Sequence, residues 1–143
     1  MRTSLRCLLL GSLALLAACA TQPPKDDSLY RALGEREGIN RIVEGMLINV
    51  AHDPGINRHF QHVEPIRLRD KLVEKFCVEA GGPCTYTGDS LAEAHKGQNI
   101  GTAEFNALVE DLIDSMDARG IPVATQNRLL ARLAAERGEV IKK

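Results

Sequence analysis

The sequence contains very few aromatic residues. Among 143 residues there are no Trp, two Tyr and three Phe, so aromatic side chains make up only 3% of the composition. Hydrophobic residues still reach 44%, largely through Leu and Ala, which favour helices together with the many Glu and Arg. This length and composition indicate one domain whose centre has few large side chains to fill it. We expect either a loosely packed helical domain or a core completed by a flat apolar cofactor.

The chain also lacks a charge excess and any sign of strands. Eighteen basic residues stand against 19 acidic ones, giving a net charge of −1, and no basic stripe follows any expected helix. This balance offers no electrostatic case for nucleic-acid binding. No segment alternates polar and apolar residues with a period of two, so the sequence predicts an all-α domain.

The first 18 residues have the features of a signal peptide. Arg2 and Arg6 precede an apolar run from Leu8 to Ala18 that is too short to span a bilayer comfortably. The run ends in residues 16–19, LAAC, which resemble the bacterial lipobox, where the cysteine becomes lipidated. The alternative is an ordinary signal peptide with a coincidental Cys19. We expect a lipidated Cys19, a flexible Pro-rich tether over residues 19–27 and a domain over residues 28–143. Because Ala20 follows Cys19, we expect the lipid-anchored protein at the outer membrane, facing the periplasm.

Two cysteines remain within the expected domain. Cys77 and Cys84 flank a Gly-Gly-Pro corner at residues 81–83, and thiols outside the cytoplasm tend to pair. A disulfide here would close an eight-residue loop, restrict the unfolded chain by about 2.5 kcal/mol and fix the segment that follows. The alternatives are a buried Cys77 with a free Cys84, or metal binding, for which two cysteines without a matching His pair are a weak signal.

The spacing of apolar residues predicts the helices. A short helical turn covers residues 28–33, and a longer helix covers residues 37–52 until Asp-Pro-Gly ends it. The next helix begins near Pro65, with an apolar stripe of Leu68, Leu72 and Phe76 beside Ile66 and Val73. Its expected solvent face consists of Arg67, Arg69, Asp70, Lys71, Glu74 and Lys75. A helix capped by Gly101 or Thr102 follows, and a last one carries Leu129, Leu130, Leu133, Val140 and Ile141.

His95 lies near the end of a short helix that starts at Asp89-Ser90 and precedes a strongly amphipathic helix. A histidine in this position suits an axial ligand that holds a haem iron from one side, while neighbouring helices supply an apolar slot. An isolated histidine is more often an ordinary surface or core residue, so spacing alone does not decide between these interpretations.

Residues 29–141 resemble a group I truncated haemoglobin. The matching segments are SLYRALGEREGINRIVEGM, DPGINRHF, GGPCTYTG and AHKGQNIGTAEFNALVEDL, followed by GIPVATQNRLL. The resemblance implies a two-over-two helical sandwich around one haem b, with His95 as the iron ligand and Phe60 packed on the porphyrin. It implies further haem contacts at Met46, Leu47, Leu68, Leu72, Phe76, Ile100, Phe105 and Leu108, and propionate contacts at Lys71 and Tyr86.

One departure from this family affects the expected function. Many members carry a Tyr and a Gln that donate hydrogen bonds in the distal pocket, whereas this chain has Leu47 and Leu72 there, with Leu68 between them. A charge-assisted hydrogen bond contributes about 1.5–3 kcal/mol, or about 10- to 150-fold in affinity. We therefore expect faster dioxygen release, easier autoxidation and a relative preference for CO.

The resemblance implies reversible binding of O2, NO or CO, as oxygen transport or gas scavenging at the cell envelope, by a monomer served by an unidentified reductase. A haem-dependent NO dioxygenase or peroxidase-like enzyme is the alternative. The other histidines leave further choices open. His52 suits a helix cap, whereas His59 or His62 could become a sixth iron ligand or remain in exposed loops. A haem-free lipoprotein is the third hypothesis.

Overall fold

The computed structural model describes residues 26–143, which fold into helices without a β-strand. The predicted signal peptide, the lipidated Cys19 and most of the tether fall outside these residues. The helices are α1 (Ser28–Ala32), α2 (Glu35–His52), α3 (Pro65–Glu79), α4 (Leu91–Ala94), α5 (Thr102–Asp117) and α6 (Val123–Ala135), with 3-10 turns η1 (Asn57–Phe60) and η2 (Arg137–Glu139). The predicted all-α class is confirmed.

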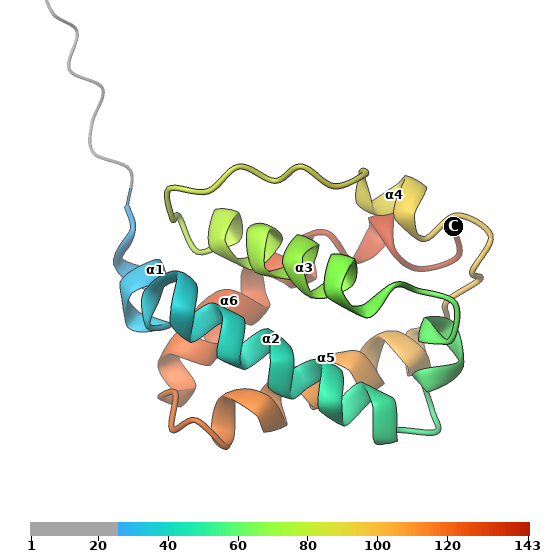
Figure 1. The fold of residues 1–143 in the computed structure, drawn as a ribbon, viewed down its shortest axis with the longest axis horizontal. Helices are drawn as coiled ribbons and strands as arrows, with labels where there is room; N and C mark the ends of the chain where they lie inside the picture. Colours follow the sequence, from blue (N-terminus) through green and yellow to red (C-terminus); the bar gives the residue numbers. More distant parts are fainter. Residues whose placement is uncertain (1–25) are drawn as a thin grey trace, which may run out of the picture.

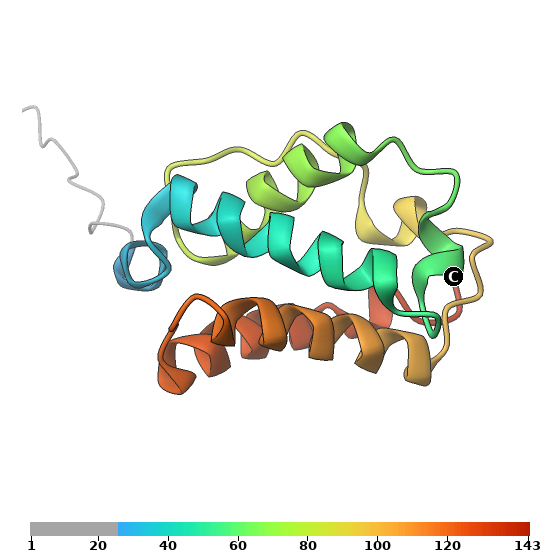
Figure 2. The same ribbon diagram turned by 60° about the horizontal axis from the view of Figure 1, so that its bottom comes forward.

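Two pairs of helices form two layers. Figure 2 shows α2 and α3 side by side in one layer and α5 and α6 in the other. The short helix α4 lies near the N-terminal end of α3. In Figure 1, α2 crosses in front of α5, and the end of the chain lies close to α4. This arrangement leaves α3 and α4 facing each other at one side of the molecule.

The core lies where the two layers meet. It is built from aliphatic side chains of α1, α2, α3, α5 and α6, among them Leu29, Ile42, Met46, Val73, Phe76, Leu112, Met116 and Leu129, each no more than 5% exposed. Helices α2 and α5 lie close together where they cross. There the hydroxyl of the small, buried Ser115 donates a hydrogen bond of 2.6 Å to the Ile42 carbonyl. The α2–α5 crossing is therefore tightly packed.

Local signals set the ends of the helices that carry the site. The Glu64 side chain accepts hydrogen bonds from the backbone N–H groups of Ile66 (3.1 Å) and Arg67 (2.6 Å), and Pro65 occupies the first turn of α3, where it needs no N–H donor. After α3, Gly81 adopts a φ of +83°, a left-handed conformation that glycine adopts without strain. The chain then leaves α3 and returns along it toward α4.

Two expectations about the helices differ from the structure. The last helix ends at Ala135, so Val140 and Ile141 follow it in an irregular segment, where Val140 lies against the site. On α3, Ile66 is 62% exposed, whereas Lys71, Glu74 and Lys75 are half-buried. The reason is that a second stretch of chain, residues 84–89, covers this side of α3 and shields its polar side chains.

Candidate functional site

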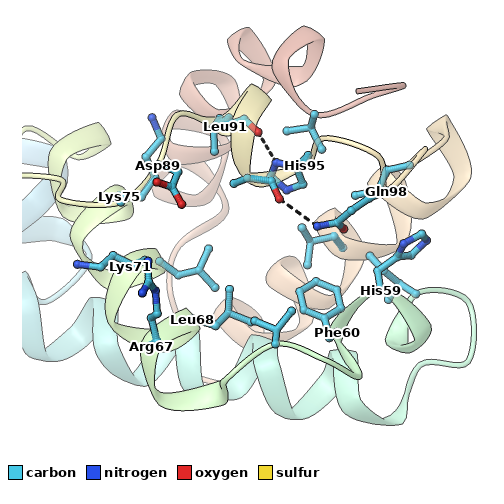
Figure 3. A pocket seen from close by; sticks show the side chains of 18 of the residues that line it. His59, Phe60, Arg67, Leu68, Lys71, Lys75, Asp89, Leu91, His95 and Gln98 are labelled. Atoms are coloured by element: carbon cyan, nitrogen blue, oxygen red, sulfur yellow. Dashed lines mark hydrogen bonds between the residues drawn. The ribbon is translucent and has the colours of Figure 1, made fainter.

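His95 follows directly after α4, and its ring is held in one orientation. The Ser90 hydroxyl caps α4 by accepting from the Glu93 N–H at 3.2 Å. The His95 Nδ1 lies 2.7 Å from the Leu91 carbonyl oxygen (Figure 3). A carbonyl can only accept, so Nδ1 carries the proton, and Nε2 of the neutral ring keeps its lone pair. None of the hydrogen bonds of the described residues involves Nε2, which leaves this nitrogen available as a ligand.

The loop after His95 is anchored by residues 142 and 143. The Gly97 N–H donates to the Lys143 backbone oxygen, and the Lys142 N–H donates to the Ile100 carbonyl, both at 2.9 Å. Gly97 and Asn99 both have positive φ values, +76° and +50°, so the loop turns sharply before α5. These two hydrogen bonds fix the residues that follow His95 against the end of the chain.

A cavity of about 300 Å³ lies between α3 and the His95 segment. Ten of the residues predicted to contact a cofactor line it together: Met46, Phe60, Leu68, Lys71, Leu72, Tyr86, His95, Ile100, Phe105 and Leu108. We call this cavity the slot. Figure 3 shows Leu68 on α3 and His95 at the end of α4 on opposite sides of the slot, with Phe60 beside it.

Two of the predicted residues do not line the slot. Phe76 lies one turn beyond Leu72 on α3 and is only 5% exposed in the core. Leu47 lines a separate groove of about 310 Å³, which shares Phe60, Val63 and Leu68 with the slot. Met46, the preceding residue on α2, lines the slot instead.

The slot is also lined by residues that the sequence did not predict as haem contacts, apart from His59, which it offered as a sixth iron ligand. They are Ile56, His59, Val63, Glu64, Arg67, Lys75, Gly88, Asp89, Leu91, Ala94, Gln98, Glu104 and Val140. Arg67 and Lys75 could have been found, because they lie one helical turn before and after Lys71 on the same face of α3. Val140 could not, since its place depends on the chain returning to the slot after η2.

Charged side chains gather along one edge of the slot, on the α3 side. The Lys71 ammonium contacts Glu74 at 3.1 Å and the Thr87 hydroxyl, while Lys75 contacts Glu136 at 2.6 Å and Glu79 at 3.0 Å. Hydrogen bonds from the Thr87 backbone N–H and hydroxyl lower the pKa of Glu74, so the carboxylate stays ionised.

Arg67, at the same edge, forms no ion pair with a described residue through its guanidinium. It is therefore available to an anion at the mouth of the slot.

The remaining histidines occupy different environments. The exposed His52 donates from Nδ1 to the Ile48 carbonyl at 2.8 Å, which fits the predicted helix cap. His62 is exposed and does not line the slot. His59 does line the slot, near Gln98 in Figure 3, and its Nε2 is buried without a hydrogen-bond partner among the described residues.

The side chains of the described residues do not form a metal site by themselves. Residues 26–143 contain no cluster of three or more His, Cys, Asp or Glu side chains arranged to hold a metal ion. None of the helices in this range is long and apolar enough to cross a membrane.

Comparisons with known proteins give a consistent result. Residues 28–141 match the model of the bacterial-like globin family. The group 1 truncated hemoglobin GlbN of Mycolicibacterium paratuberculosis is 31% identical over 107 residues, which are 75% of this chain and 79% of that protein. The group 1 truncated hemoglobin of Tetrahymena pyriformis is 24% identical over 119 residues, 83% of this chain and 98% of that protein.

Solved structures share the same arrangement of helices. The Fe(III) form of the truncated hemoglobin from Tetrahymena pyriformis has a TM-score of 0.78 at 23% identity, covering 80% of this chain and 98% of that one. The 2/2 hemoglobin from Synechococcus, solved in the cyanomet state with covalently attached heme, has a TM-score of 0.74 at 19% identity, covering 79% and 97%. The two-over-two fold expected from the sequence is confirmed.

Proposed function

The chain belongs to the bacterial-like globin family as a group 1 truncated hemoglobin, and from this premise we propose that it binds one haem b in the slot and uses it to bind diatomic gases reversibly. The observation that carries this proposal is the state of His95. Its Nδ1 is committed to the Leu91 carbonyl at 2.7 Å, so Nε2 is the nitrogen left for an iron atom. A hydrogen bond from the ring nitrogen that does not bind the metal fixes the tautomer and orientation of a ligating histidine.

The rest of the slot fits a haem in both shape and polarity. Aliphatic and aromatic side chains line its interior, including Leu68, Leu72 and Phe105, whereas the cationic groups lie at one edge. A haem has an apolar ring and two anionic propionates, so Arg67 and Lys71 would hold the propionates. The unpartnered Nε2 of His59 indicates that the slot is completed by another group.

The wall opposite His95 favours a small apolar ligand. When bound in the slot, haem would supply an iron atom that His95 would hold and at which a diatomic gas would bind. Leu68, Leu72 and Met46 line the slot without a hydrogen-bond donor. These side chains exclude water and stabilise a polar ligand little, which favours rapid exchange of O2, NO or CO over tight retention.

The test is an absorption spectrum of the full chain, purified in detergent and reconstituted with hemin. We expect a Soret band with one haem per chain and reversible spectral changes with O2, CO and NO after reduction. The His95→Ala variant should lose the Soret band of the reconstituted protein and release hemin. The His62→Ala variant should keep the Soret band and the hemin, because His62 lies outside the slot. Colourless wild-type protein would refute the proposal.

A haem-dependent peroxidase or NO dioxygenase is the second candidate, because one observation favours it. Peroxide turnover requires a general base beside the reacting group, and the buried His59 Nε2 has no partner among the described residues. Steady-state peroxide turnover that falls in His59→Ala but not in His52→Ala would support this activity.

We also infer that the protein acts as a monomer at the bacterial cell envelope, anchored through lipid on Cys19 and reduced by a separate protein. The support is the lipobox-like sequence at residues 16–19. Mass spectrometry of the mature protein would detect the diacylglyceryl cysteine, and Cys19→Ser should abolish both the lipid and the membrane association.

A further inference from the structure

The segment between α3 and α4 is attached to α3 at two places about one helical turn apart. A disulfide joins Cys77 on α3 to Cys84, seven residues later in the chain. Three residues further on, Thr87 donates to the Glu74 carboxylate from its backbone N–H at 2.9 Å and from its hydroxyl at 2.8 Å. The first attachment is covalent, and the second is exposed to competition from water.

This segment builds part of the slot and leads to His95. Tyr86, Gly88 and Asp89 line the slot, and Leu91, whose carbonyl orients the His95 ring, follows within two residues. The Tyr86 hydroxyl donates to the Asp89 carbonyl at 2.9 Å, which makes residues 86–89 a compact turn. A shift of the segment away from α3 would therefore open the slot and at the same time displace the Leu91 carbonyl that orients the His95 ring.

Building on the proposed function, we propose that Cys77 and Cys84 are positioning residues for the haem, and that the chain retains haem firmly only with this disulfide formed. In the reduced chain, only non-covalent contacts hold the segment on α3. They are the hydrogen bonds from Thr87 to Glu74, the contact of Lys71 with the Thr87 hydroxyl, and the Lys75 ammonium 5.7 Å from the centre of the Tyr86 ring. The unfolded and partly opened states of the segment then become more accessible, since a covalent link no longer restricts them. Firm haem retention thus requires an oxidising compartment.

The surroundings of the two sulfur atoms differ, and this difference determines which cysteine reacts first when the disulfide forms. Cys77 is fully buried, Cys84 is half-exposed, and the Arg36 Nη1 lies 3.6 Å from the Cys84 Sγ. A guanidinium beside a sulfur favours its thiolate form, so Cys84 is the first nucleophile.

With oxidised glutathione as the oxidant, the Cys84 thiolate attacks one glutathione sulfur and displaces the other as a thiolate. The Cys77 thiolate then attacks the Cys84 Sγ and displaces the second glutathione. The two protein thiols lose two electrons and two protons, and two molecules of reduced glutathione form.

The test measures hemin loss from the full chain in detergent, by transfer to excess apomyoglobin followed in the Soret band. We expect Cys77→Ala/Cys84→Ala and the wild type reduced with dithiothreitol to lose hemin at least about tenfold faster than the oxidised wild type. Dithiothreitol should have no effect on the double variant, which controls for Cys7 and Cys19. Arg36→Gln should slow reoxidation of the reduced wild type by oxidised glutathione.

A matched control separates positioning from general loss of stability. Leu129→Ala removes a fully buried side chain of α6 outside the slot, and it should lower the unfolding free energy without the same hemin loss. Hydrogen exchange of the hemin-free protein should show faster exchange over residues 84–95 in the double variant only.

Equal hemin loss in the oxidised wild type and the double variant, or loss that matches Leu129→Ala at equal stability, would overturn the proposal. A wild type that binds no hemin refutes the proposed function instead. In that case, hydrogen exchange of the hemin-free protein still tests whether the disulfide holds this segment. Unchanged exchange over residues 84–95 in the double variant would show that it does not.

Discussion

Gly45 on α2 lies directly against Ser115 on α5, so that a Cβ placed on Gly45 would stand 2.5 Å from the Ser115 hydroxyl oxygen. The Arg119 guanidinium covers the same point, with both terminal nitrogens 2.5 Å from that Cβ position. Arg119 is itself held by Ser115, through hydrogen bonds of 2.8 Å to its carbonyl and 3.0 Å to its hydroxyl. This contact sets the separation of the two layers on which the slot is built.

Gly45→Ala should therefore destabilise the fold. The added methyl group must displace the Arg119 side chain and strain the Ser115 hydrogen bond to Ile42, and overpacking of this kind costs about 1–3 kcal/mol. Urea unfolding followed by circular dichroism measures the change. Gly138→Ala is the control, because a methyl group added at Gly138 would meet no atom within 4 Å. Equal stability of the two variants would contradict the tight crossing.

Asp111 should make stability depend on pH. It is buried, 8% exposed, and its Oδ2 has no partner among the described residues. Burial raises its pKa to about 6, and the charges of Asp53, Asp114 and Glu110 add to this effect. The folded chain therefore binds a proton that the unfolded chain releases near pH 4, and unfolding free energy falls as pH rises from about 4 to about 6.

Above that range the ionised Asp111 costs about 3 kcal/mol at most. Asp111→Asn removes the ionisation, so we expect it to stabilise the protein by about 2 kcal/mol at pH 8 and by less than about 1 kcal/mol at pH 4.5. Urea midpoints at the two pH values measure this difference. The exposed Glu139→Gln on η2 is the control, because Glu139 is not among the charges that act on Asp111. A gain that is independent of pH would show that Asp111 is not the responsible group.

Much of this structure follows from the sequence. Apolar spacing predicts α2, α3 and α5, and Ser90 and Pro65 mark helix starts correctly, because these signals act within one or two helical turns. The burial of Lys71 and Lys75 could not be predicted, since it depends on residues 84–89 returning over α3. Leu47 and Met46 show the same limit within the site. They are adjacent on α2, and only the packing of α3 and η1 decides which of them faces the slot.

Arg67→Gln should weaken haem retention modestly. Arg67 lines the edge of the slot and forms no ion pair with a described residue, so its guanidinium is free to hold a propionate. An exposed pair of this kind contributes little, and we expect hemin transfer to apomyoglobin to accelerate by about two- to fivefold. Arg41→Gln is the control, because Arg41 pairs with Glu37 away from the slot. Unchanged transfer at low ionic strength would rule out a propionate contact at Arg67.

Leu72→Gln tests the consequence of the apolar wall. Leu72 lines the slot from α3, where the amide N–H of glutamine could donate a hydrogen bond to a polarised gas ligand. A hydrogen bond to a charged group contributes about 1.5–3 kcal/mol, so we expect dioxygen release to slow by about 10- to 150-fold. Carbon monoxide release should change much less, because this ligand is less polar. Leu72→Met matches the length of glutamine without a donor and should release dioxygen like the wild type. If Leu72→Met slows release as much as Leu72→Gln, side-chain shape rather than hydrogen bonding controls the ligand.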